Sequence, residues 1–314
     1  MEEKIPEILY HYCSVDTFIK IIQNKTLRLS EITKSNDSME CRWLEKAVIP
    51  EMLGSICDNL CKRKKFDDSE QERITSNYTR AIAERELNRY FEGNEGLINR
   101  KLVLATSFSQ KRDLLSQWRG YADDGYGVAI GFNTDIFKPY ISQSEMAPCN
   151  FKKVIYNRRM QESKVRRNLK NYLRKLIDDP KNQKTTILQD LIFRMLESSI
   201  FIKNPAFVEE AEWRFYIAIY FVNDYSELKQ AIDMLKINDM LQELNVSTRS
   251  NKAIFYSDIK FETIDINKDK QPWLKEIVIG PKCKLSERDV RLLLGRYDWD
   301  TVGLAINKSI ATYI

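Results

Sequence analysis

The order of strand-like and helix-like segments is the feature that most constrains how this chain of 314 residues folds. Apolar runs typical of strands gather toward both ends, and segments with helical periodicity fill the middle. Strand and helix do not alternate regularly, which argues against a doubly wound parallel sheet. The order predicts an α+β fold with a mixed or antiparallel β-sheet core and helical insertions.

The expected elements follow from apolar spacing and from turn and capping residues. Strands are expected at 8–12, 26–30, 102–108, 127–132, 153–156, 213–221, 254–261, 276–279 and 301–306. Helices are expected after Ser14, at 39–60 and 69–91, twice within 161–201, at 224–244, and after a capping box at 286–289. We expect one domain over 1–314, with a helical insertion at 39–92 and a basic helical insertion at 161–205.

Composition limits the class of protein. With 43% hydrophobic residues the chain can bury a full core, and a net charge of +5 is too small alone to argue for nucleic-acid binding. The longest apolar run, 215–222, is far shorter than the roughly 20 residues needed to cross a bilayer. The N-terminus does not resemble a signal peptide. We therefore expect a cytoplasmic protein that does not act at a membrane.

The cysteines and the single histidine restrict the chemistry. The six cysteines are scattered, and no second pair with zinc-ligand spacing follows Cys57 and Cys61, so we expect free thiols and no metal. His11 is the only histidine, which excludes any site that needs two, including His-x-x-x-His zinc hydrolases. A lone histidine is most often a strand residue that hydrogen-bonds to backbone.

In the segment 207–214, three acids stand directly before the apolar strand expected at 213–221. Residues two apart on an extended chain share a face, so Glu210 and Glu212 are expected to project together. One carboxylate could hold a sugar hydroxyl and stabilise positive charge on a ribose carbon, and the other could activate a nucleophile. The alternatives are a solvated acidic helix end, or a structural segment with Trp213 buried and Arg214 paired to an acid.

Two further segments offer binding side chains. Ser107 and Ser109 share a face at a strand end, where they could support a ligand or simply cap a turn. In the segment 117–121, Trp118 is expected in the core, Tyr121 could stack on a planar ring, and Arg119 could hold a phosphate or amide.

The strongest charge bias lies between residues 152 and 175, a segment that contains ten Lys or Arg residues and a single acid, Glu162. An apolar seam runs through the same helix. A solvated basic face is the default interpretation, and contact with nucleic-acid phosphates is the alternative.

Seven blocks together resemble a bacterial family, domain of unknown function 2971. They follow the order of that family along nearly the whole chain: 9–12, 26–30, 36–40, 107–109, 117–121, 212–214 and 277–281. The same blocks resemble, more distantly, the ADP-ribosyltransferase superfamily. That likeness implies a sheet core of ADP-ribosyltransferase-like type and NAD as the substrate, with no metal.

The superfamily resemblance also implies roles for particular residues. His11 and Tyr12 on the first strand, with Ser107, Ser109, Arg119 and Tyr121, would bind NAD. Glu212 would stabilise the ribosyl cation, and Glu210 would position the acceptor. The function expected is transfer of ADP-ribose to a protein or nucleic acid, or NAD hydrolysis, chemistry that suits a toxin or phage-defence effector. The alternative is a non-enzymatic nucleic-acid-associated or regulatory protein that uses the basic helical region.

Overall fold

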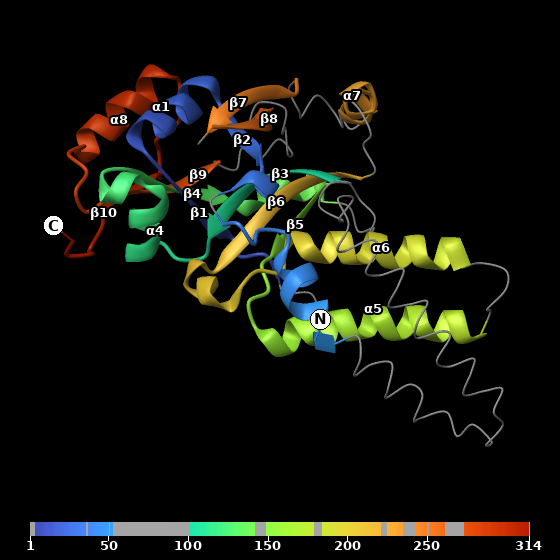
Figure 1. The fold of residues 1–314 in the computed structure, drawn as a ribbon. Coiled ribbons are helices and arrows are strands. Elements are labelled where there is room, and N and C mark those ends of the chain that lie inside the picture. The colour runs from blue at the N-terminus through green and yellow to red at the C-terminus, as the bar shows by residue number, and fades with distance from the viewer. Residues whose placement is uncertain are drawn as a thin grey trace, which may run out of the picture.

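The computed structural model describes residues 4–35, 37–49, 51–52, 101–141, 149–178, 184–220, 225–234, 243–249, 251–260 and 273–313. Its fold is α+β, as expected, with a mixed, mostly antiparallel open sheet (Figure 1). Most of the insertion expected at 39–92 lies outside the described residues. So do the helix expected at 69–91 and both Cys57 and Cys61.

The described residues form one ten-stranded sheet in the order β10-β9-β4-β1-β3-β2-β8-β7, in which β6 also pairs with β3 and β5 pairs with β6. Only β9 and β10 run parallel among the strand pairs described. The strands are β1 (Ile8–Cys13), β2 (Thr26–Glu31), β3 (Lys101–Ser109), β4 (Val128–Asn133), β5 (Cys149–Lys153), β6 (Glu212–Tyr220), β7 (Asn245–Arg249), β8 (Lys252–Lys260), β9 (Leu274–Ile279) and β10 (Ala305–Lys308).

The helices connect these strands. They are α1 (Val15–Asn24), α4 (Leu115–Tyr121), α5 (Arg158–Asp178), α6 (Lys184–Ile200), α7 (Tyr225–Met234) and α8 (Glu287–Arg296). Shorter turns are the 3-10 helices η1 (Ile32–Lys34), η4 (Asp123–Gly125), η5 (Thr134–Tyr140) and η6 (Pro205–Glu210), and the π-helix η2 (Leu44–Val48). Within the described residues, no helix combines the length and apolarity needed to cross a bilayer.

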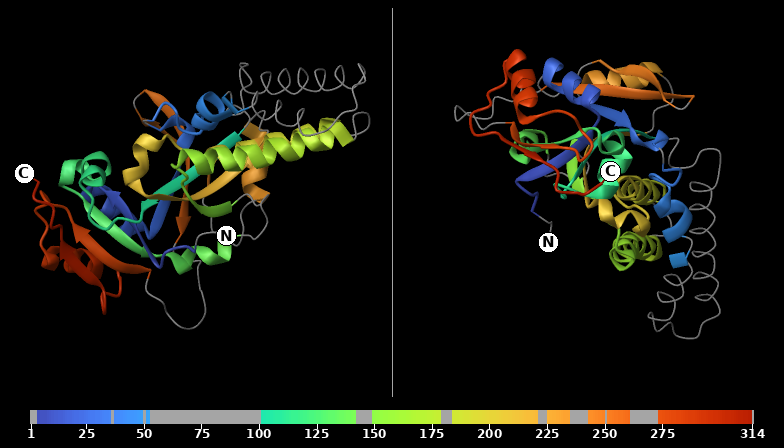
Figure 2. Two further views of the ribbon diagram at one scale, coloured as in Figure 1. Left: turned by 90° about the horizontal axis from the view of Figure 1, so that it is seen from below. Right: turned by 90° about the vertical axis from the view of Figure 1, so that its left-hand side faces the viewer.

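Helices cover both faces of the sheet. One face carries α1 and α8, while α4, α5 and α6 lie on the other (Figure 1). When the molecule is viewed from the side that carries α4, α5 and α6, η6 lies between α4 and α5 (Figure 2, left). We call the side that carries α4, α5 and α6 the α4/α5 face, and the opposite side the α1/α8 face.

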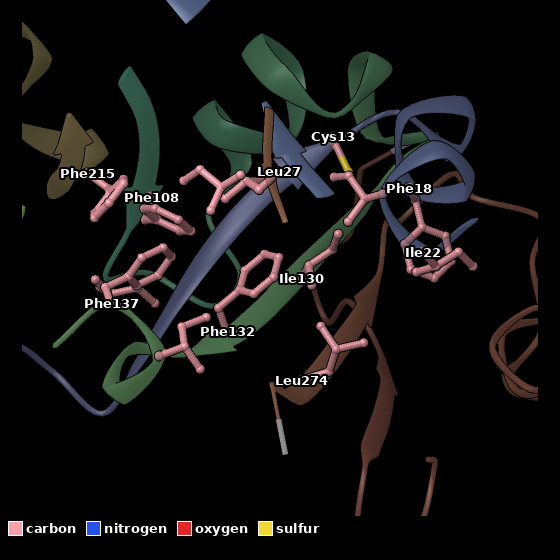
Figure 3. Close-up of a cluster of buried hydrophobic side chains, with 14 of the residues drawn as sticks. Cys13, Phe18, Ile22, Leu27, Phe108, Ile130, Phe132, Phe137, Phe215 and Leu274 are labelled. Carbon is pink, nitrogen blue, oxygen red and sulfur yellow. The ribbon is translucent and has the colours of Figure 1, made fainter. Parts of the chain in front are cut away.

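The largest core fills the α1/α8 face. Apolar side chains from β1, β3, β4, β6 and β9 meet α1 there, with Phe108 packed edge-on against Phe132 and Phe137 at ring-centroid distances of 5.8 and 5.4 Å (Figure 3). Since side chains alternate along a strand, the same strands supply the smaller cores under α4 and under α5 and α6 on the other face. The sheet is therefore buried on both sides over its central strands.

Several expected elements shift in the structure. The short strand expected at 153–156 is β5 at Cys149–Lys153, and the last strand begins at Ala305 because Gly303 takes a left-handed turn with φ of 75°. Of the helix expected at 224–244, α7 is present over Tyr225–Met234, and 235–242 lies outside the described residues. The strand β7 was not expected at all. Its polar sequence at 245–249 pairs antiparallel with β8, and Asn251, just before β8, is left-handed with φ of 61°.

The candidate site lies at a fork in the sheet, where β1 and β2 pair with different parts of β3. On one side β3 pairs with β6 over its whole length, from Lys101 to Ser109. On its other side β2 pairs only with Leu104 and Ala105, and β1 pairs only with Ser109. The stretch of β3 between these two pairings therefore lies where β1 and β2 diverge.

Candidate active site

Four polar side chains converge at the end of β3 and the start of β6. Ser107 lies opposite Arg214, and Ser109 lies opposite Glu212, in the antiparallel register. Alternation along both strands turns all four side chains to the α4/α5 face, as predicted for the two serines. The register thus brings a carboxylate, a guanidinium and two hydroxyls together.

Arg214 is the centre of this cluster and is only 2% exposed. Its Nε and Nη2 donate to the two oxygens of Glu212 at 2.6 and 2.9 Å. Nη1 and Nη2 donate to the two oxygens of Glu40 at 2.6 and 3.1 Å, and Nη1 also donates to the Ile200 carbonyl at 2.6 Å. All five N–H donors of the guanidinium are used, which satisfies the requirement for burying this charge.

A second buried cation, Lys203, lies among the acids. Its Nζ is 2.7 Å from Glu210 Oε2, 3.4 Å from Glu212 Oε2 and 3.6 Å from Glu40 Oε2. Burial disfavours the ammonium, but Glu212 and the other carboxylates outweigh burial and raise the pKa of Lys203. We call Glu40, Lys203, Glu210, Glu212 and Arg214 the acidic cluster, because its three carboxylates exceed its two cations.

Glu212 is held ionised within the acidic cluster. Burial alone would favour the neutral carboxyl, but Arg214 and Lys203 outweigh burial and lower the pKa of Glu212 to about 2. Ser107 Oγ donates to Glu212 Oε1 at 2.6 Å. Ser107 is exposed, whereas Glu212 is 6% exposed. The serine therefore separates a fixed negative charge from solvent.

Glu210 reaches the same cluster by an unexpected route. It is the last residue of η6, and Ala211 turns the chain with a left-handed φ of 45°, so the expectation that Glu210 and Glu212 share an extended segment is wrong. The two carboxylates still meet at Lys203. Tyr121, whose side chain is 51% exposed, donates its hydroxyl to Glu210 Oε1 at 2.9 Å and so links α4 to η6.

His11 lies on the other face of the sheet. Its ring packs edge-on against Phe108 at 5.9 Å, and its Nδ1 is 3.0 Å from the Ser107 carbonyl. A carbonyl can only accept, so Nδ1 carries the proton of the neutral ring. Burial lowers the pKa of His11, against the smaller opposing effect of this hydrogen bond. His11 caps the Ser107 carbonyl at the fork, and the structure does not bring its side chain to the acidic cluster.

Two other candidate ligands also lie apart from the acidic cluster. The Tyr12 hydroxyl donates to the Lys111 carbonyl and accepts from the Leu114 amide, which fixes the start of α4. The Arg119 guanidinium lies 5.3 Å from the centre of the Tyr313 ring. Trp118 is fully buried, as predicted for a core residue. Ser109 Oγ donates to the Glu210 carbonyl at 2.7 Å. Of the residues expected from the sequence, Ser107, Ser109, Tyr121, Glu210 and Glu212 are therefore the ones that converge.

One cross-strand row continues from Glu212 to a second carboxylate. It runs over five strands on the α4/α5 face, through Glu212, Ser109, Tyr10, Gly131 and Glu276. At its far end Glu276 accepts hydrogen bonds from the side chains of Tyr10, Arg112 and Asn307 at 2.7 to 2.9 Å. Burial opposes ionisation, but these donors lower the pKa of Glu276. This second group was not expected from the sequence.

The sequence predicts no role for three residues of the site, Glu40, Lys203 and Tyr156. Tyr156 is 6% exposed, and its hydroxyl has no hydrogen-bond partner among the described residues. Burial, together with the charges of Glu212 and Glu210, raises the pKa of Tyr156. The available signal was the position of Lys203 directly after the apolar segment 200–202.

The carboxylates of the acidic cluster bind the cations of the same cluster, Lys203 and Arg214. Within the described residues, no group of three or more His, Cys, Asp or Glu is placed to hold a metal ion. The carboxylates of Glu40, Glu210 and Glu212 instead surround Lys203 and Arg214.

A family model described as "Protein of unknown function (DUF2971)" matches residues 117–215. The chain is similar to this family over that range. The match begins at the segment that forms α4 and ends just after Arg214, so it includes two of the seven blocks from which the family was expected. No curated protein and no solved structure matches the chain.

Proposed function

We propose that this chain is an NAD-consuming, ADP-ribosyltransferase-like enzyme whose site lies at the start of β6, between α4 and η6. The observation that supports this proposal best is the hydrogen bond of 2.6 Å from exposed Ser107 to the buried, ionised carboxylate of Glu212. It puts a fixed negative charge one hydroxyl away from solvent. The distant sequence resemblance to ADP-ribosyltransferases suggests NAD as the substrate that uses this charge.

The reaction requires a stable negative charge beside the ribose. The bond between ribose C1′ and the nicotinamide nitrogen breaks, its electron pair neutralises the pyridinium, and positive charge develops on the ribose. An acceptor nucleophile, or water, then forms a bond to C1′ and releases a proton. A carboxylate with a pKa of about 2 remains ionised at neutral pH, so Glu212 is suited to stabilise this charge. The same low pKa makes Glu212 a poor proton acceptor.

Glu212 can receive a ribose hydroxyl only by exchanging a donor. Its Oε1 accepts from Ser107 and Arg214, and its Oε2 accepts from Arg214 and Lys203, so all four lone pairs are used. Ser107 is the neutral and exposed member of this set, and its replacement costs the least desolvation. We therefore assign the ribose hydroxyl to the position of the Ser107 hydroxyl.

Glu210 and Tyr121 would bind the acceptor side of the reaction. Each oxygen of Glu210 accepts one hydrogen bond from the acidic cluster or α4, which leaves one lone pair on each for an incoming nucleophile. The exposed Tyr121 ring offers a surface for the planar nicotinamide or for the acceptor. His11 acts here as a positioning residue, since it holds the main chain of Ser107.

Nicotinamide release from NAD by the purified chain tests this function directly. The protein without substitutions, called the parent, should release nicotinamide, and NAD should raise its melting temperature. Glu212→Gln should abolish release, and Glu210→Gln should reduce it at least about 10-fold. Glu209→Gln is the matched control, because Glu209 is an exposed neighbour outside the acidic cluster, and it should release nicotinamide at the parental rate.

A loss of fold must be separated from a loss of chemistry, because Glu212 also pairs with buried Arg214. Tyr121→Phe serves this purpose, since it removes only an exposed hydroxyl bonded to Glu210. It should keep the parental melting temperature and still lower the release rate. The proposal is wrong if the parent neither releases nicotinamide nor gains thermal stability from NAD, or if Glu210→Gln and Tyr121→Phe leave a measured release unchanged.

A further inference from the structure

Helix α5 carries a stripe of basic side chains along its outer side. Arg159, Arg166, Arg167 and Lys170 fall within an arc of roughly 100° at 100° per residue, over about 16 Å of helix. Arg159 and Arg167 are exposed, and the other two are half-buried. We call these four residues the α5 stripe.

The opposite side of α5 is apolar and fixed. Val165, Leu169 and Tyr172 are buried and pack in the same core as α6. Figure 1 shows the two helices side by side, projecting past the sheet. The α5 stripe is therefore held on a rigid element and cannot turn toward the acids of its own core.

Basic residues near the α5 stripe are paired, in contrast to the stripe itself. Arg158 contacts Glu162 and Glu51, while other ion pairs join Lys175 to Asp190, Arg194 to Asp190 and Lys152 to Glu197. Among the described residues, no carboxylate lies within ion-pair distance of any of the four α5 stripe side chains. Four neighbouring cations repel one another, and an external polyanion would remove that repulsion.

We propose that the α5 stripe binds the phosphate backbone of a nucleic-acid duplex. The exposed positions of α5 present charged and polar groups and Met160, while the aromatic residue of the helix, Tyr172, is buried. Single-stranded nucleic acids are bound largely by stacking on aromatic side chains, which the stripe does not offer. A row of cations on a straight helix suits the regularly spaced phosphates of a duplex, without reading the sequence. None of the four residues belongs to the acidic cluster, so the inference does not depend on NAD turnover.

Fluorescence anisotropy of a labelled 24-base-pair DNA duplex, titrated with the full chain at several salt concentrations, tests the proposal. Affinity should fall steeply with salt. The variant Arg159→Gln, Arg166→Gln, Arg167→Gln, Lys170→Gln should bind at least about 10-fold more weakly at low salt. Its slope of log affinity against log salt should be shallower by about 3 to 4, since each phosphate contact contributes about 0.9.

A second quadruple variant controls for net charge. Lys20→Gln, Lys138→Gln, Lys284→Gln, Arg288→Gln removes the same charge from exposed positions elsewhere and should retain the parental slope. The inference is overturned if both variants lose affinity equally, which shows a general charge effect, or if the α5 stripe variant binds like the parent. Equal competition by poly-glutamate at matched charge would identify an acidic protein as the partner, and tighter binding of a matched single strand would exclude the duplex.

Discussion

Glu212 and Arg214, two residues apart on β6, face the same side of the sheet and are joined by side-chain hydrogen bonds of 2.6 and 2.9 Å. Arg214 binds Glu40 in the same two-point manner, so one guanidinium connects the start of β6 to residues that precede η2. Arg214 is 2% exposed and Glu212 is 6% exposed. Its charges depend on one another, because neither can reach water to replace the lost partner.

Arg214→Gln should therefore destabilise the protein by about 3–5 kcal/mol, the range for leaving buried charges without their partner. The loss of stability is large because Arg214 is buried and its removal takes two hydrogen bonds from Glu40 and two from Glu212. Urea denaturation followed by circular dichroism measures the change. Arg291→Gln breaks an exposed pair with Glu287 and should cost less than about 1 kcal/mol. Equal small losses in both variants would show that the buried cluster contributes little.

Stability at acid pH should depend on Glu212. Its pKa is lowered to about 2 in the folded protein, below the ordinary value of 4.5. The unfolded chain therefore binds the proton first, and the stabilisation from this group, present above about pH 4.5, is lost as pH falls toward 2. Urea midpoints between pH 6 and 3 should fall in the parent. In Glu212→Gln the fall should be smaller, and parallel curves for the two proteins would argue against this assignment.

His11 should also make the folded protein less stable as pH falls, but at a higher pH than Glu212 does. Burial lowers its pKa below 6.5, so the unfolded chain takes up a proton that the folded chain resists, and stability should decrease as pH falls below about 6.5. His11 is the only histidine, so one imidazole resonance in a proton NMR titration reports the pKa directly. His11→Gln should remove the slope between pH 6.5 and 5.5. An imidazole that titrates at 6.5 or above would contradict the burial argument.

The sequence could predict which residues of one strand share a face, but not how strands align. Alternation correctly paired Ser107 with Ser109, and the capping box at Ser286 is present. The position of His11 could not be derived, because it depends on Tyr10 lying opposite Ser109 across two strands that are far apart in the chain. That register turns Tyr10 toward the α4/α5 face and His11 away from it.

The acidic cluster was only half predictable for a similar reason. Trp213 is buried and Arg214 is paired to acids, as the structural interpretation of this segment expects. Glu210 reaches Lys203 through the left-handed turn at Ala211, a conformation that alanine seldom adopts and that propensity does not predict. Glu40 and Lys203 come from segments whose approach to β6 is set by tertiary packing.

Two glycines beside α4 carry the last prediction. A Cβ on Gly127 would lie 2.1 Å from the Cys13 carbonyl oxygen, and one on Gly280 would lie 2.4 Å from the Gly125 carbonyl oxygen. Both contacts are with backbone, and for Gly280 relief requires the main chain after β9 to move away from η4, so Gly280→Ala should destabilise the protein by about 2 kcal/mol or more. Gly295 in α8 has nothing within 4 Å of its Cβ position, and Gly295→Ala should be neutral or stabilising by up to about 1 kcal/mol. Thermal unfolding of both variants compares them, and equal melting temperatures would show that the main chain around Gly280 moves without cost.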